Sequence, residues 1–138
     1  MALEEMDRRK FPRVSYPCMV KVISPVGPQQ QFLTHTENIG QGGLRVILKN
    51  EIKLFSPVEM EVDLLCVDEH IHPKGRVVWN ARRKSVEKIK PMFYDIGIEF
   101  TEIRKSDEEC LRKALLKMKL NYLLQLLADK ETPLSESN

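Results

Sequence analysis

The stretch Val58-Glu59-Met60-Glu61-Val62-Asp63-Leu64 alternates apolar and acidic residues without a break. Successive side chains of a β-strand point to opposite faces, so this pattern predicts a strand with one buried face and one wet face. Shorter runs of the same kind lie on both sides of it. The predicted strands are 14–23, 30–37, 44–48, 58–64, 71–81 and 93–100. Six short strands ahead of any helix favour an antiparallel barrel or sandwich.

The single predicted helix covers residues 106–129 and opens on Ser106-Asp107-Glu108-Glu109, which is a capping-box pattern. It carries two apolar stripes, one of which is enough to lie against a barrel. The first stripe is Leu111, Leu115, Met118 and Tyr122, and the second is Leu116, Leu120, Leu123 and Leu127. The second stripe is explained equally well by core packing, by a homo-oligomer formed through the helix, or by a docked partner.

Length and composition indicate one globular domain. The chain has 138 residues, of which 42% are hydrophobic and 30% charged, and no apolar run approaches the length of a membrane span. The organisation we expect is a flexible leader over 1–8, one domain over 9–129 with its barrel at 14–101, and a disordered tail over 130–138. The N-terminus is acidic and lacks a signal-peptide pattern, so we expect a cytoplasmic protein without membrane insertion.

The charge balance and the cysteines exclude several function classes. A net charge of +2 is too small for a general DNA or RNA binder, so an anion site must come from a local cluster of cations. Cys18, Cys66 and Cys110 are odd in number and far apart, which favours reduced thiols over a disulfide framework. The sequence has no nucleophile–base pattern and no phosphate-binding P-loop, so we expect no enzyme and no cofactor.

Two segments in the first third of the chain are suited to an anionic nucleotide. Arg9-Lys10-Phe11-Pro12-Arg13 presents two guanidiniums on a segment that Pro12 keeps from becoming helical. A guanidinium can bond two phosphate oxygens at once and can also stack on a base. Asn38-Ile39-Gly40-Gln41-Gly42-Gly43 offers an amide that matches a guanine edge, beside glycines that allow close backbone approach.

These two segments resemble the signatures of PilZ domains, Arg-x-x-x-Arg and (Asp/Asn)-x-Ser-x-x-Gly. Gly75-Arg76-Val77-Val78-Trp79 and Tyr94-Asp95-Ile96-Gly97-Ile98-Glu99-Phe100 are similar to the later strands of the same family. The resemblance implies a mainly β fold, a six-stranded antiparallel, Greek-key-like β-barrel followed by a long C-terminal α-helix. It also implies a receptor for the bacterial second messenger cyclic di-GMP.

The family's ligand contacts can be carried over by position. The resemblance implies that Arg9 and Arg13 engage phosphates and guanines, that Asn38 contacts a guanine, and that Gly43 permits close approach. Arg8 precedes the first motif, where a cation suits a stacked pair of ligands. Gly40 departs from the family because it replaces the serine, and the loss of that hydroxyl should weaken binding about tenfold without abolishing it. Secondary candidates for ligand contact are Lys10, Gly42 and Trp79.

Two other features have an ordinary structural explanation that we prefer. Trp79 fits a barrel core or rim position better than a base-stacking platform. The cluster of Cys66, Asp68, Glu69, His70 and His72 contains metal-ligand types, but an exposed hairpin explains it, and we expect no metal site.

The functional expectation is therefore a cyclic di-GMP receptor that orders its N-terminal arginine segment on binding and signals to a protein partner. The alternative is a nucleotide-independent interaction module that uses the barrel surface and the helix. The replacement of serine by Gly40 and the second leucine stripe favour this alternative.

Overall fold

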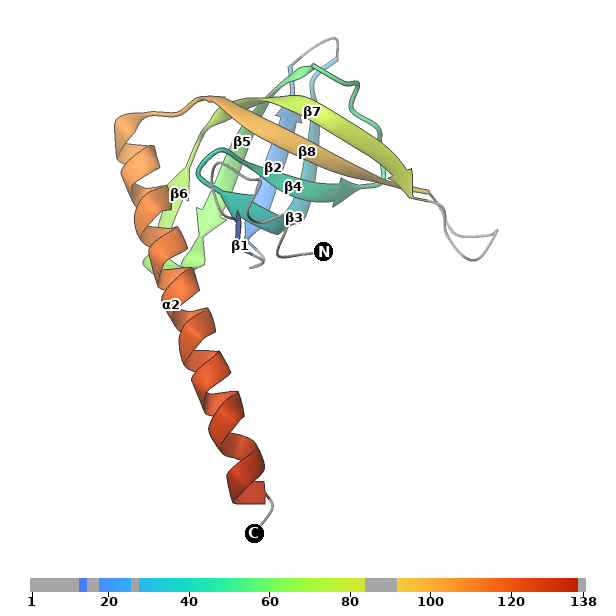
Figure 1. Cartoon of the computed structure of the whole chain (residues 1–138). Coiled ribbons are helices and arrows are strands. Elements are labelled where there is room, and N and C mark those ends of the chain that lie inside the picture. The colour runs from blue at the N-terminus through green and yellow to red at the C-terminus, as the bar shows by residue number, and fades with distance from the viewer. Residues whose placement is uncertain (1–12, 15–17, 26–27, 84–91, 137–138) are drawn as a thin grey trace.

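The structure is a computed structural model that describes residues 13–14, 18–25, 28–83 and 92–136. Six long strands form a closed antiparallel barrel in the order β3-β2-β5-β7-β8-β4, and the pairing of β3 with β4 closes it (Figure 1). These strands are β2 (Met19–Ser24), β3 (Gln30–Gly40), β4 (Gly43–Leu48), β5 (Pro57–Leu64), β7 (Lys74–Arg83) and β8 (Phe93–Glu102). The predicted six-stranded barrel is confirmed.

The residues of β5 face the core and the solvent alternately, as the sequence pattern predicted. Val58, Met60, Val62 and Leu64 of β5 are each at most 1% exposed, whereas the acidic residues between them face outward. The barrel interior is filled by aliphatic side chains from all six long strands. Full burial of each such side chain stabilises the fold by roughly 1.5–3 kcal/mol. The interior is therefore a packed core.

Two short strands extend the barrel. β1 (Arg13–Val14) pairs with the end of β3, and β6 (Glu69–Ile71) pairs with the end of β5. The strand predicted over 71–81 is therefore two strands, β6 and β7. Pro73 lies between them, and proline cannot donate to a strand ladder. The 3₁₀ helix η1 (Leu65–Val67) and Asp68, whose φ of 54° is left-handed, make the turn expected near Asp68.

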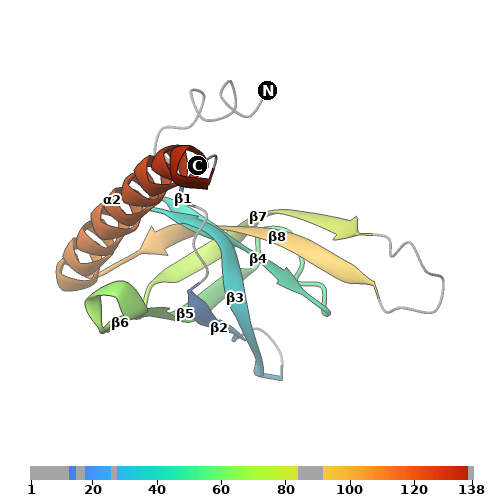
Figure 2. The ribbon, with the colours of Figure 1, turned by 90° about the horizontal axis from the view of Figure 1, so that it is seen from below.

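The helix α2 (Lys105–Glu136) packs on η1 and β6 with its first half and projects away from the barrel with its second half (Figures 1 and 2). Leu111, Ala114 and Met118 are buried against the barrel. The helix starts one residue before the expected start and continues past residue 129, where we expected it to end. It includes residues 130–136 of the expected tail. No glycine or proline lies between its start and Thr132 to stop it, and it continues through Pro133 to Glu136.

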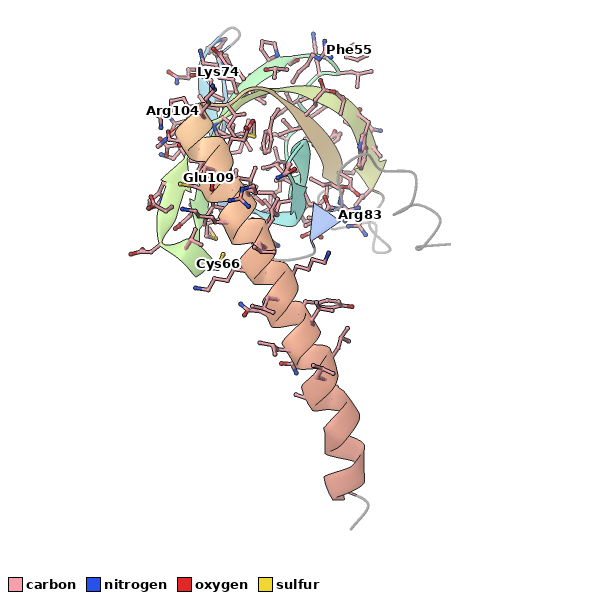
Figure 3. The ribbon with its side chains drawn as sticks, turned by 60° about the vertical axis from the view of Figure 1, so that its left-hand side comes forward. Phe55, Cys66, Lys74, Arg83, Arg104 and Glu109 are labelled. Atoms are coloured by element: carbon pink, nitrogen blue, oxygen red, sulfur yellow. The ribbon has the colours of Figure 1, made fainter. Side chains whose placement is uncertain are left out.

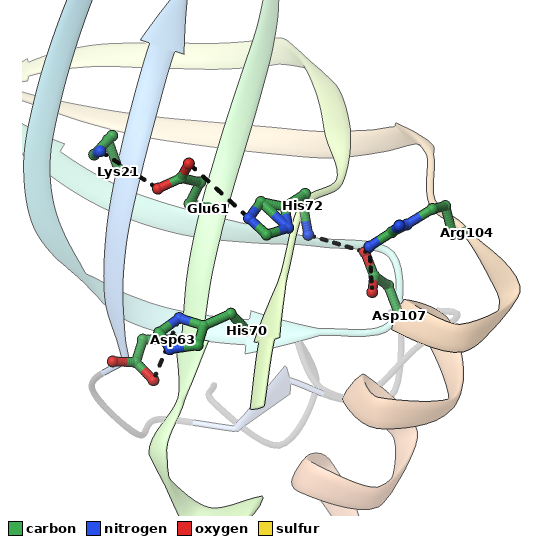
Figure 4. Close-up of polar contacts among 7 residues, drawn as sticks. All are labelled: Lys21, Glu61, Asp63, His70, His72, Arg104 and Asp107. Carbon is green, nitrogen blue, oxygen red and sulfur yellow. Dashed lines mark hydrogen bonds and ion pairs between the residues drawn. The ribbon is translucent and has the colours of Figure 1, made fainter. Parts of the chain in front are cut away.

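Asp107 joins the start of α2 to the barrel. Its Oδ2 atom accepts a hydrogen bond of 2.9 Å from the backbone N–H of His72, and Arg104 pairs with its carboxylate at 3.2 Å (Figure 4). Asp107 is 4% exposed, so this bond satisfies a charge that would otherwise be costly to bury. Glu109 was expected to form a capping box with Ser106, but its carboxylate pairs with Arg112 and the helix already begins at Lys105.

The three cysteines carry unpaired thiols. Cys18 is buried, and its burial raises the pKa of the thiol to about 11. None of the helices in the described part of the chain is long and apolar enough to span a bilayer.

Candidate functional site

The pairing of β1 with β3 brings together the two motifs that sequence analysis singled out. Arg13 lies opposite Gly40, and Val14 lies opposite Ile39. Ile39 is fully buried, so the side chain of Asn38 next to it on β3 lies on the outer face of the barrel. The end of the arginine motif and the centre of the glycine motif are thus neighbours. Arg8, Arg9 and Lys10 lie outside the described residues.

A row of four residues crosses the outer face beside this junction. Asn38 of β3 pairs with Arg45 of β4, Arg45 with Gly97 of β8, and Gly97 with Trp79 of β7. Residues directly opposite one another on antiparallel strands share a face of the sheet, so these four form one surface. Arg45 was not among the predicted site residues. The alternation over 44–48 assigns it to the outer face, but only the register places it beside Asn38.

The charge of Arg45 is already balanced by carboxylates. Its Nε atom lies 3.4 Å from Oδ1 of Asp95, and its Nη2 atom lies 3.9 Å from Oε1 of Glu37. Glu37 in turn lies 3.2 Å from Nε2 of His35. The Nε and Oδ1 atoms are both buried and face each other outside hydrogen-bond geometry. This outer face is therefore not cationic by itself, so an anionic ligand would need charge from the N-terminal arginines.

Two of the three glycines of the second motif, Gly42 and Gly43, contact β8 of the barrel. A Cβ atom placed on Gly43 would stand 2.1 Å from the carbonyl oxygen of Ile98, closer than any real contact. The carbonyl oxygen of Gly42 accepts a bond of 2.9 Å from the N–H of Phe100. The close approach at Gly43 is thus to the backbone of β8, which gives this glycine a structural role beside the implied ligand role.

Trp79, for which a core or rim position was expected, lies on the outer surface of the barrel and not in its core. It is 37% exposed, and its indole lies over Gly97, where a Cβ would come within 2.2 Å of Nε1. Glycine at position 97 therefore provides the space in which the ring lies. The result is an aromatic ring at the far end of the row that begins at Asn38.

The histidines after η1 face separate carboxylates. His70 Nδ1 lies 3.9 Å from Asp63 Oδ1, and His72 Nε2 lies 3.9 Å from Glu61 Oε1 (Figure 4). Within the described residues, no group of three or more histidine, cysteine or acidic side chains could hold a metal ion. These pairs are exposed, and such ion pairs contribute little to stability.

The family model of the PilZ domain matches residues 7–117, which is most of the chain. The chain belongs to the PilZ domain family. The match includes both motifs, every strand of the barrel and the barrel-packed part of α2. The family expected from the two motifs and the later strands is confirmed. Comparison with the curated proteins finds no match.

Several solved structures share this fold. The PilZ domain of YcgR from Escherichia coli, solved with c-di-GMP, has a TM-score of 0.65 at 16% identity, with coverage of 89% of this chain and 98% of that one. The c-di-GMP complex of MrkH from K. pneumonia has a TM-score of 0.70 at 16% identity, with coverage of 86% and 55%.

The inhibitor of motility MotI/DgrA from Bacillus subtilis has a TM-score of 0.65 at 18% identity, with coverage of 83% of this chain and 52% of that one. This PilZ chain thus spans about half the length of the MotI/DgrA and MrkH chains. At these identities the likeness establishes the fold.

Proposed function

We propose that this PilZ domain binds cyclic di-GMP at the junction of β1 and β3, as a receptor and not as an enzyme. The observation that carries the proposal is the pairing of Arg13 with Gly40, which joins both PilZ motifs at one place. The YcgR and MrkH structures that share the fold were solved with c-di-GMP, which supports this ligand. The proposed contacts are Arg8, Arg9, Arg13, Asn38, Gly40 and Gly43, with Lys10, Gly42 and Trp79 at the margin.

The N-terminal segment and the barrel would bind different parts of the ligand. Cyclic di-GMP carries two phosphates, while the nearby cation Arg45 is held by Asp95 and Glu37. The arginines at 8, 9 and 13 supply the positive charge, and each charge-assisted bond is worth about 1.5–3 kcal/mol. Asn38 presents its amide to a guanine on the outer face of β3.

A ligand-ordered arginine segment would act on the helix through β1. β1 contacts α2 as well as pairing with β3, so one short strand touches both the proposed ligand site and the helix. Binding that fixes the residues before β1 would change the surface formed by β1 and the first half of α2. A protein partner that binds this surface would then bind the ligand-bound and ligand-free forms with different affinity.

Calorimetric titration of the full chain with cyclic di-GMP tests the proposal. We expect saturable binding that weakens about 10- to 100-fold in each of Arg9→Ala and Arg13→Ala, because each removes one charge-assisted contact. Arg112→Ala is the matched control, since this exposed arginine is paired with Glu109 on α2. No heat at high micromolar ligand, or equal binding by all four proteins, would refute the proposal.

Position 40 offers a test in the opposite direction. Gly40→Ser restores the hydroxyl of the family motif, and we expect binding to tighten by up to about tenfold. Unchanged affinity with unchanged thermal stability would show that the ligand does not lie against residue 40.

A second candidate is a nucleotide-independent interaction module that uses the barrel surface and α2. The absence of a hydroxyl at Gly40 and the exposed leucines of α2 favour it. Light scattering of the protein mixed with a cell extract that contains its partner, with and without cyclic di-GMP, distinguishes the receptor from the nucleotide-independent module. A complex that forms equally well without cyclic di-GMP supports the second.

A further inference from the structure

The second half of α2 is apolar and has no cover from its own barrel. Figures 1 and 3 show the ribbon of this half standing clear of the strands. Every residue from 119 to 129 is exposed. Seven large apolar side chains near and within this stretch are each at least 41% exposed, namely Leu116, Leu120, Tyr122, Leu123, Leu124, Leu126 and Leu127. Such a concentration of exposed apolar surface marks an interaction site.

Four of these residues form a regular seam. Leu116, Leu120, Leu123 and Leu127 follow one another at spacings of four, three and four, which is the a/d spacing of a coiled coil. The seam extends roughly 16 Å along the helix at 1.5 Å per residue. We call these four residues the α2 seam.

The α2 seam lies on the opposite side of the helix from the barrel. The residues buried against the barrel are Leu111, Ala114 and Met118. With 3.6 residues per turn, the mean direction of these three differs from that of the seam by roughly 180°. A second helix can therefore lie on the seam without displacing the barrel.

The helix also needs a partner for its own stability. Residues 119–136 extend beyond Met118, the last residue of α2 that is buried against the barrel. An isolated helix of this length is marginal in water, because packing of an apolar face supplies most helical stability. Packing along the α2 seam would supply it here.

The charges along α2 indicate what covers the seam. Residues 112–119 contain four cations and no carboxylate, namely Arg112, Lys113, Lys117 and Lys119. Residues 120–129 contain one carboxylate, Asp129, and no cation. Two parallel copies would place basic segment beside basic segment, whereas two antiparallel copies place each basic segment beside the segment that carries Asp129.

We propose that two copies of this chain associate through antiparallel pairing of their α2 seams. The surface is self-complementary under a two-fold axis, both in its leucines and in its reversed charge pattern, as an isologous dimer requires. The association does not depend on cyclic di-GMP, so its test is carried out without nucleotide and stands apart from the proposed receptor function.

Sedimentation equilibrium of the full chain measures the association. We expect twice the mass of the 16.1 kDa chain at about 100 μM, and a monomer for the double variant Leu120→Ser/Leu123→Ser, with a dissociation constant raised at least about tenfold. Leu33→Ser/Leu54→Ser is the matched control, because these exposed leucines lie in β3 and between β4 and β5, outside the elements on which α2 packs. A monomeric wild type, a larger oligomer, or a dimer that survives the seam variant would overturn the proposal.

Charge reversal tests the direction of pairing. In Lys113→Glu/Lys119→Glu we expect the dimer to weaken at least about threefold, because the cationic segment that faces Asp129 becomes neutral. A parallel pair would instead tighten, since the net charge of residues 112–119 would fall from +4 to zero on both helices, and that result would overturn the antiparallel arrangement. The control Lys49→Glu/Lys53→Glu makes the same charge change at exposed barrel positions and should leave the dissociation constant unchanged.

Discussion

Replacement of Asp107 by alanine should detach the start of α2 from the barrel. The variant loses the 2.9 Å bond from the His72 N–H and the pairing with Arg104. A hydrogen bond to a charged group is worth about 1.5–3 kcal/mol, the exposed Arg104 contributes at most about 1, and the positive helix end adds about 0.3–1. Because these terms overlap, we expect Asp107→Ala to lower the free energy of unfolding by about 2–4 kcal/mol.

Urea denaturation followed by circular dichroism measures this loss. With a slope of about 1–3 kcal/mol per molar urea, the midpoint should fall by roughly 1–2 M. Glu108→Ala is the matched control, because Glu108 lies in the same first turn but is exposed, and it should cost less than about 1 kcal/mol. Asp107→Asn keeps an acceptor for the His72 N–H and should fall between the two. Equal midpoints for Asp107→Ala and Glu108→Ala would refute the reasoning.

Three further outcomes follow from buried groups. Gly97→Val should displace the indole of Trp79, the only tryptophan, and shift its fluorescence to longer wavelength; an unchanged spectrum would contradict the contact. The pKa of Cys18 is raised in the fold from 9.0 to about 11, so the unfolded chain ionises first and stability should fall as pH rises from about 9 to 11. A Cys18→Ala variant should lack that component of the decline, as pH-dependent unfolding would show. Leu111→Ala should cost about 2–5 kcal/mol in urea unfolding, whereas Leu124→Ala, at an exposed position, should cost far less.

Strand alternation was sufficient to predict the barrel but not all of its elements. The alternation over 58–64 decides which side chains face the core, and this does not depend on which strand lies next to it. The structure buries the apolar residues of this stretch, as predicted. The division of 71–81 at Pro73 and the extension of α2 to Glu136 were not predicted. Proline and glycine indicate where an element can end, but contacts with the rest of the fold decide where it does end.

The sequence by itself determined the family, the six strands and most of the apolar stripe of α2 that meets the barrel, because periodicity and motifs are local properties of the chain. Tyr122, the last residue of the predicted stripe, is exposed beyond the barrel. The tertiary structure alone decided that Arg13 lies opposite Gly40 and that Arg45, Gly97 and Trp79 continue the row from Asn38. These contacts depend on strand register across a closed barrel, which no local pattern contains. The structure likewise decided that the α2 seam stays uncovered, because the barrel can bury only one side of a helix that extends beyond it.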